Sequence, residues 1–110
     1  MKLFFNLISL SFALSISAQN TSIKGLLLEE DGSALPFANT LLFQSSDSSL
    51  AKANLSTETG QFSFNDMPEG SYNILVRYLG MEDHTIENIQ VKSNAPIDLG
   101  AIKLKSSGIQ

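Results

Sequence analysis

Apolar side chains recur at every second position along most of the chain after residue 20, and this alternation limits the possible folds more than any other feature. In the segment 72–78, Tyr72, Ile74, Val76 and Tyr78 would share one face of an extended strand. No segment longer than the N-terminal apolar stretch shows the 3.6-residue period of a helix. The pattern therefore predicts an all-β protein.

Turn residues interrupt the alternation about every ten positions, which predicts about seven short strands. We expect these strands at residues 22–28, 38–43, 50–55, 61–64, 72–78, 85–91 and 99–104. The sixth should contain a bulge, because Ile86 and Ile89 cannot otherwise share a face. Pro68 and Gly70 are expected to reverse the chain so that 72–78 pairs beside 61–64. Many short strands at this spacing are typical of an antiparallel sandwich.

The first 18 residues have the features of a signal peptide. Met1-Lys2 gives a positive start, an apolar stretch runs over 3–14, and the small residues of 15–18 suit a signal peptidase that cleaves after Ala18 or Ser17. A transmembrane anchor is the alternative, but Asn6 and four serines interrupt a stretch that would need about 20 apolar residues. We therefore expect an exported protein with a signal peptide at 1–18, one sandwich domain at 19–104, and a tail or truncated linker at 105–110.

The charge balance excludes some classes of partner and cofactor. The 110 residues contain 7 Lys or Arg and 11 Asp or Glu, for a net charge of −4. This acidic balance argues against binding nucleic acid through bulk charge. The chain has no cysteine and one histidine, so it holds neither a disulfide framework nor a thiolate or multi-histidine metal site.

Candidate catalytic and metal-binding residues are few. His84 follows Glu82 and Asp83, but neighbouring strand residues point to opposite faces and would not converge on one ion. The acidic run 29–31 lacks the alternating oxygen ligands and distal Glu of a calcium loop. No Gly-x-Ser-x-Gly elbow or phosphate-binding glycine loop occurs. We predict no enzyme activity, no catalytic residue, no bound metal and no cofactor.

A series of short motifs occurs in a fixed order along the chain. The residues that carry these motifs are Gly25, Gly32, Pro36, Gly60, Phe62, Phe64, Pro68, Gly70, Tyr72, Tyr78 and Gly80. The series resembles the carboxypeptidase regulatory-like domain, in the version that follows the signal peptide of TonB-dependent outer-membrane receptors in Gram-negative bacteria. The similarity covers about residues 21–104, with Phe37 where the family often has Gly and Met81 where an aromatic is usual. The resemblance implies scaffold roles for all of the motif residues.

The resemblance implies a seven-stranded Greek-key sandwich without catalytic residues. It also implies an accessory or interaction domain on the periplasmic side of the outer membrane, with a receptor plug and barrel or another periplasmic protein as partner. A barrel of 22 strands needs roughly 220 residues, so contact with the membrane would require a barrel outside this chain. The alternative is a freestanding periplasmic or secreted sandwich that binds carbohydrate or a protein. Four aromatic side chains could form a sugar-stacking strip, namely Phe62, Phe64, Tyr72 and Tyr78, but their alternation predicts that they are core residues first.

Overall fold

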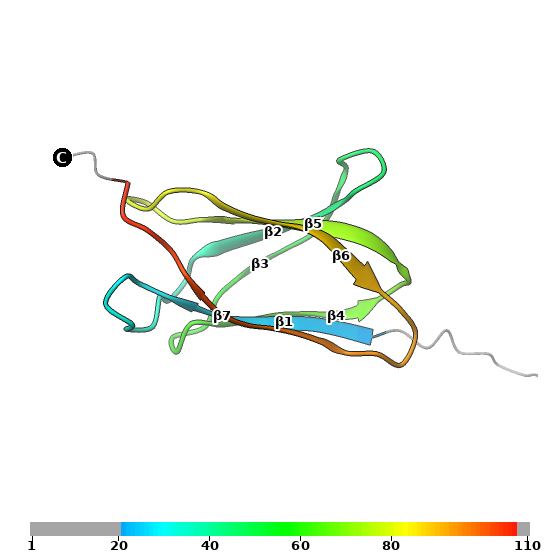
Figure 1. Ribbon diagram of the computed structural model, residues 1–110, viewed down its shortest axis with the longest axis horizontal. Coiled ribbons are helices and arrows are strands. Elements are labelled where there is room, and N and C mark those ends of the chain that lie inside the picture. The colour runs from blue at the N-terminus through cyan, green and yellow to red at the C-terminus, as the bar shows by residue number, and fades with distance from the viewer. Residues whose placement is uncertain (1–20, 108–110) are drawn as a thin grey trace, which may run out of the picture.

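The computed structural model describes residues 21–107 and contains seven strands in two facing sheets (Figure 1). The strands are β1 Thr21–Leu28, β2 Asn39–Gln44, β3 Leu50–Leu55, β4 Gln61–Met67, β5 Gly70–Arg77, β6 His84–Val91 and β7 Ile97–Lys103. One sheet has the order β4-β1-β7 and the other β3-β2-β5-β6. Across 21–107 there is no helix of the length and apolar character needed to cross a membrane. The expected all-β sandwich is confirmed.

Four of the five strand pairings are antiparallel, and the pairing of β1 with β7 is parallel. The chain reverses direction at each of its six connections, so the first and last strands run the same way (Figure 1). The expectation that 72–78 pairs beside 61–64 is wrong. The turn at residues 68–70 carries the chain from one sheet to the other, and β5 pairs with β2 and β6.

The bulge expected in the sixth strand is present. Tyr72 faces Ile89 and Ile74 faces Ile86, so β6 carries one residue more than β5 between these pairs. Asn88 lies in this bulge with a φ of 60°, and its backbone N–H donates to the Asn73 side-chain oxygen at 3.0 Å. The bulge turns both isoleucines toward the core, as the sequence required.

The hydrophobic core lies between the two sheets. The expected inward faces are confirmed, since Phe62, Phe64 and Tyr72 are at most 4% exposed. The rings of Phe62 and Phe64 meet edge to face with centroids 6.1 Å apart. Together with the Leu, Ile and Val side chains of both sheets they form one continuous buried cluster.

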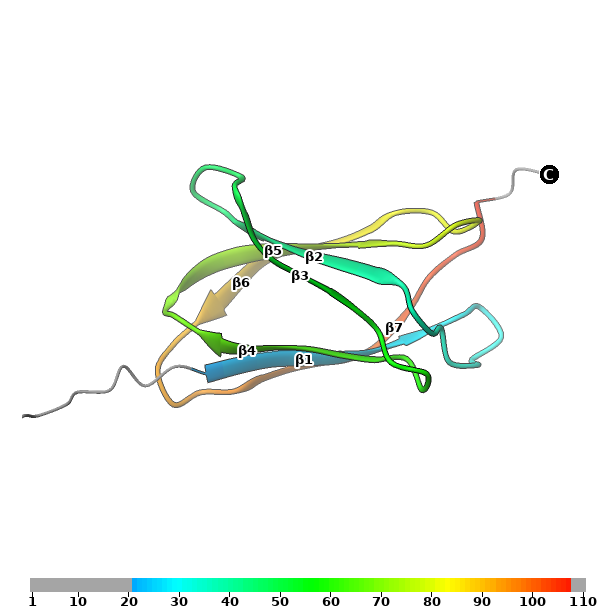
Figure 2. The same cartoon turned by 180° about the vertical axis from the view of Figure 1, so that it is seen from behind.

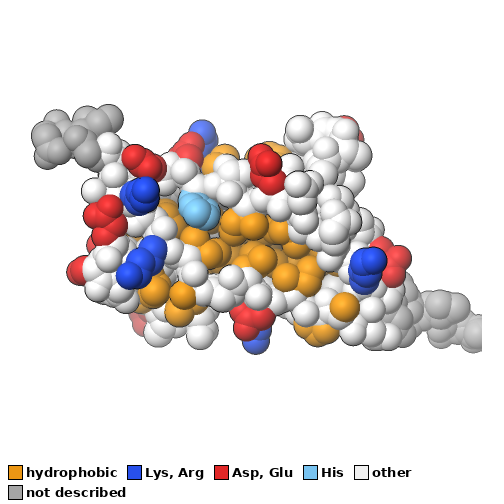
Figure 3. All heavy atoms as spheres, in the orientation of Figure 1, with side chains coloured by type: hydrophobic (Ala, Val, Ile, Leu, Met, Phe, Trp, Pro, Cys, Tyr) orange, Lys and Arg blue, Asp and Glu red, His pale blue; other side chains and the backbone are white. Residues whose placement is uncertain are grey.

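The two open sides of the sandwich differ. On the side of β3 and β4, the Lys52 and Asn54 side chains donate to backbone carbonyls of β4. On the side of β6 and β7, apolar side chains gather in a hollow (Figure 3). Ile86, Ile97 and Leu99 are partly buried there against the core.

The alternating strand directions place three loops at the same end of the sandwich (Figures 1 and 2). We call this the loop end and define it as residues 29–38, 56–60 and 78–83. The segment after β7 returns to it, since Ser107 N–H donates to the Gly80 carbonyl and Glu82 N–H donates to the Lys105 carbonyl. The N-terminus of β1 lies at the opposite end (Figure 1).

Candidate interaction site at the loop end

The eleven residues of the motif series are spread over the fold and do not form one site. They are Gly25 in β1, Gly32 and Pro36 between β1 and β2, Gly60 before β4, Phe62 and Phe64 in β4, Pro68 between β4 and β5, Gly70 and Tyr72 in β5, and Tyr78 and Gly80 after β5. Several act in turns or packing. Gly60 has a φ of 84°, and its carbonyl accepts from Leu27 N–H. The Tyr72 hydroxyl donates to the Pro68 carbonyl at 2.9 Å, and burial raises the pKa of this phenol.

The acidic and histidine side chains considered for chemistry do not converge. Asp83 pairs with Arg77 at 3.1 Å on the surface, whereas His84 begins β6 opposite Val76. Asp31 accepts hydrogen bonds from the side chain and backbone N–H of Ser33, and these bonds lower the pKa of its carboxyl group. Between residues 21 and 107, no three His, Asp or Glu side chains are grouped so that they could hold a metal ion.

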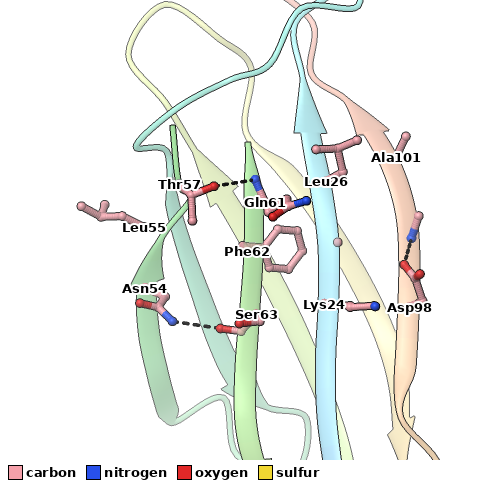
Figure 4. A pocket seen from close by; sticks show the side chains of 12 residues that line it. Lys24, Leu26, Asn54, Leu55, Thr57, Gln61, Phe62, Ser63, Asp98 and Ala101 are labelled. Carbon is pink, nitrogen blue, oxygen red and sulfur yellow. Dashed lines mark hydrogen bonds between the residues drawn. The ribbon is translucent and has the colours of Figure 1, made fainter. Parts of the chain in front are cut away.

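A groove of about 640 Å³ crosses the outer face of the three-stranded sheet beside β3 (Figure 4). Its lining is mixed, with polar side chains such as Lys24, Gln61 and Asp98 beside the apolar Leu26, Leu55 and Ala101. The polar groups partly satisfy one another, as Thr57 Oγ1 accepts from Gln61 N–H. Phe62 lies among the lining residues (Figure 4) but is only 3% exposed. Phe64 and Tyr72 are also at most 4% exposed and Tyr78 is partly buried, so three of the four rings considered as a sugar-stacking strip lie in the core.

Large exposed apolar side chains concentrate instead at the loop end. Phe37 is 56% exposed and Leu79 96% exposed, both in its loops, and Leu55 is 53% exposed at the adjoining end of β3. In the part of the chain that the structure describes, only Leu50 adds to this class, and it lies at the other end. Loops at one end of a sandwich are a common place for binding residues, because a rigid scaffold positions them.

The backbone around Phe37 is held by a buried serine. The Ser56 hydroxyl, 1% exposed, accepts from Ala38 N–H at 2.9 Å and donates to the Leu35 carbonyl at 2.8 Å. Its backbone adds two bonds, from Phe37 N–H to the Ser56 carbonyl and from Ser56 N–H to the Ala38 carbonyl. Phe37 adopts a φ of 60° within this clamp. In the sequence, the only sign of this conformation is that Phe37 stands where the family often has Gly.

The loop end is also the most acidic part of the protein. Its three loops contain six of the chain's 11 carboxylates and no Lys or Arg. These carboxylates are Glu29, Glu30, Asp31, Glu58, Glu82 and Asp83. Arg77, Lys103 and Lys105 flank the loops, and Arg77 is paired with Asp83. The apolar side chains thus stand in a surface of net negative charge.

Comparison with known proteins gives a family and a fold. The sequence model of the carboxypeptidase regulatory-like domain matches residues 22–105. No curated protein matches the chain. Among solved structures, the Bacillus anthracis TIE protein is similar with a TM-score of 0.64 and 18% identity over 80% of this chain.

Two further structures show how widely the fold is shared. The minor pilin of Streptococcus agalactiae has a TM-score of 0.61 and 13% identity over 84% of this chain. Catechol 1,2-dioxygenase from Pseudomonas arvilla C-1 has a TM-score of 0.66 and 9% identity over 86%. The chain spans 17%, 47% and 55% of the TIE protein, the pilin and the dioxygenase respectively. At these identities the likeness concerns the fold alone.

Proposed function

The chain belongs to the family of carboxypeptidase regulatory-like domains, and from this we propose that it is a non-catalytic interaction domain of an outer-membrane TonB-dependent receptor system. Its role in this proposal is to contact a receptor plug and barrel or another periplasmic protein. The domain contributes binding and no chemistry.

The loop end carries the interaction part of the proposal. Phe37 and Leu79 are exposed on rigidly connected loops, and exposed aromatic and aliphatic side chains are the usual anchors of protein interfaces. A catalytic centre is the alternative, but among residues 21–107 no acidic, basic or metal-ligating side chains converge to form one. The structural neighbours include both a pilin and a dioxygenase, so the shared fold by itself assigns neither a binding nor a catalytic role.

The edges of both sheets further restrict the mode of contact. Each of the four edge strands, β3, β4, β6 and β7, carries a register shift against its neighbour. Such bulges interrupt the row of free backbone groups and disfavour addition of a partner strand. We therefore expect the domain to bind through side chains of its loops.

The receptor context rests on the family resemblance and on the signal peptide expected at residues 1–18, which lies outside the described residues.

The receptor context can be tested by placing a photo-crosslinking amino acid at position 79 in a Gram-negative host, with position 50 at the other end of the domain as the matched control. Mass spectrometry should find position 79 joined to an outer-membrane receptor, and the exported chain should begin at Ala18 or Gln19. A chain that keeps Met1, or position 79 crosslinked only to cytoplasmic proteins, would contradict the proposal.

A further inference from the structure

We propose that Phe37 is the anchor of the loop end and inserts into an apolar pocket on a protein partner whose rim carries Lys or Arg side chains. This inference rests on the proposed interaction role and adds the residue and the chemistry of the partner. It follows from a backbone conformation, an exposed ring and the charge around it.

The conformation of Phe37 is unfavourable for its residue type. A φ of 60° lies in the left-handed region, where the β-carbon of an L-residue crowds the following carbonyl. Glycine adopts this conformation without that conflict. An aromatic residue at such a position is a true outlier, and strain of this kind persists only where the surroundings enforce it.

The surroundings of Phe37 meet this condition. The four hydrogen bonds between Ser56 and the segment 35–38 fix the backbone on both sides of the strained residue. The ring gains little burial in exchange, since 56% of the residue remains exposed. Folding alone therefore gives no reason for a phenylalanine here, whereas presentation of a ring to a partner does.

The partner's chemistry follows from the charge of the loop end. Six carboxylates and no cation lie in the same three loops as Phe37 and Leu79. A surface that accepts this ring must bring positive side chains against the carboxylates, because like charges brought together oppose binding. A second copy of the chain and an anionic lipid surface both present negative charge, and each is disfavoured. A protein pocket with an apolar floor and a basic rim fits both features.

The strain is tested by comparing two variants that both remove the ring. If the φ of residue 37 is enforced, Phe37→Gly should melt above Phe37→Ala by about 4 °C or more, because only alanine keeps a β-carbon. Leu50 is the matched control, being equally exposed but free of a positive φ. There the order should invert, with Leu50→Gly melting below Leu50→Ala. An alanine variant at position 37 as stable as the glycine variant would overturn the claim of strain.

The partner chemistry is tested on the exported protein with a defined probe, a 14-residue amphipathic helix of Leu and Lys. In 15N-labelled protein, the peptide should shift the amide signals of the loop end. The melting test checks that Phe37→Gly is folded. This variant should bind the peptide at least tenfold more weakly than the wild type. A peptide with Glu in place of Lys should not bind, and added salt should weaken the Lys peptide.

Several results would overturn the assignment. Equal affinity of Phe37→Gly and the wild type for the Lys peptide, or amide shifts confined to the groove beside Gln61 and Asp98, would contradict the anchor. Binding of the Glu peptide would contradict the basic rim. Phe37-dependent binding to phosphatidylglycerol vesicles, or a Phe37-dependent dimer in sedimentation, would contradict the protein partner. The two proposals fail separately. A receptor crosslink from position 79 without any effect of Phe37 would keep the interaction role and remove the anchor. Peptide binding through Phe37 without a receptor crosslink would keep the anchor and the interaction role and remove the receptor context.

Discussion

The ring of Phe62 occupies the space that a β-carbon on Gly25 would need. A β-carbon built at position 25 would lie 2.6 Å from Cε2 and 2.7 Å from Cζ of that ring. The two residues face each other across the antiparallel pair of β1 and β4. Gly25 has no positive φ, so glycine is required here by packing and not by backbone conformation.

Replacing Gly25 by alanine should lower the free energy of unfolding by about 1–3 kcal/mol, the usual cost of overpacking a core. Urea denaturation measures the change. In a Phe62→Leu background the same substitution should cost less, because the shorter side chain leaves the space free. An equal cost in both backgrounds would show that the ring is not the cause.

Replacing Ser56 by alanine should cost about 1–3 kcal/mol, because Ala38 N–H and the Leu35 carbonyl would both lose a buried partner. Ser49→Ala is the matched control, since the Ser49 hydroxyl donates to Asp47 on the exposed surface. It should change stability by less than about 0.5 kcal/mol. Equal unfolding midpoints for the two variants would contradict the clamp.

Stability should fall at acid pH in part through Glu69. The hydroxyl and the backbone N–H of Ser93 both donate to its carboxylate, at 2.7 and 2.9 Å, and these bonds lower its pKa from the usual 4.5. Because the folded pKa lies below the unfolded one, the contribution is fully present above about pH 4.5. It is lost as the pH falls through the lower folded value.

The advantage of the wild type over Glu69→Gln in urea midpoint should therefore shrink between pH 6 and pH 3. Asp31 and Asp47 have lowered pKa values for the same reason, through Ser33 and Ser49. They remain in both proteins and so cancel in the comparison. A difference that stays constant over this range would exclude the Glu69 interaction as its source.

Removal of divalent cations should leave the thermal midpoint unchanged. Two of the three carboxylates in the run 29–31 already have protein donors, since Asp31 accepts from Ser33 and Glu30 accepts from Ser106 N–H at 3.3 Å. Melting curves with and without EDTA check this expectation. A fall of many degrees would instead identify that run as a calcium site and would argue for a calcium-dependent adhesion role.

The local pattern of the sequence predicts the strands and their inward faces. Side-chain direction alternates along any extended strand, so Tyr72, Ile74 and Val76 could be assigned to one face without knowledge of the partner strand. Even the bulge at Asn88 follows from two isoleucines spaced three apart. These features depend only on residues close in sequence.

Pairing between distant strands could not be predicted in this way. The parallel contact of β1 with β7 joins residues more than 70 positions apart, as Ile23 with Ile97. The turn at 68–70 has the same composition whether it closes a hairpin or leads to the opposite sheet. The φ of Phe37 likewise depends on Ser56, which has no local feature that separates it from the chain's many other serines.

The parallel pair of β1 and β7 has a mechanical consequence. The chain enters the domain through β1 at one end and leaves through β7 at the other, and these two strands are hydrogen-bonded neighbours. A pull applied between the two ends would drag the strands in opposite directions along their length. Their hydrogen bonds would then be sheared together, and not opened one after another. Built in this way, the domain would pass tension along its length before it yielded.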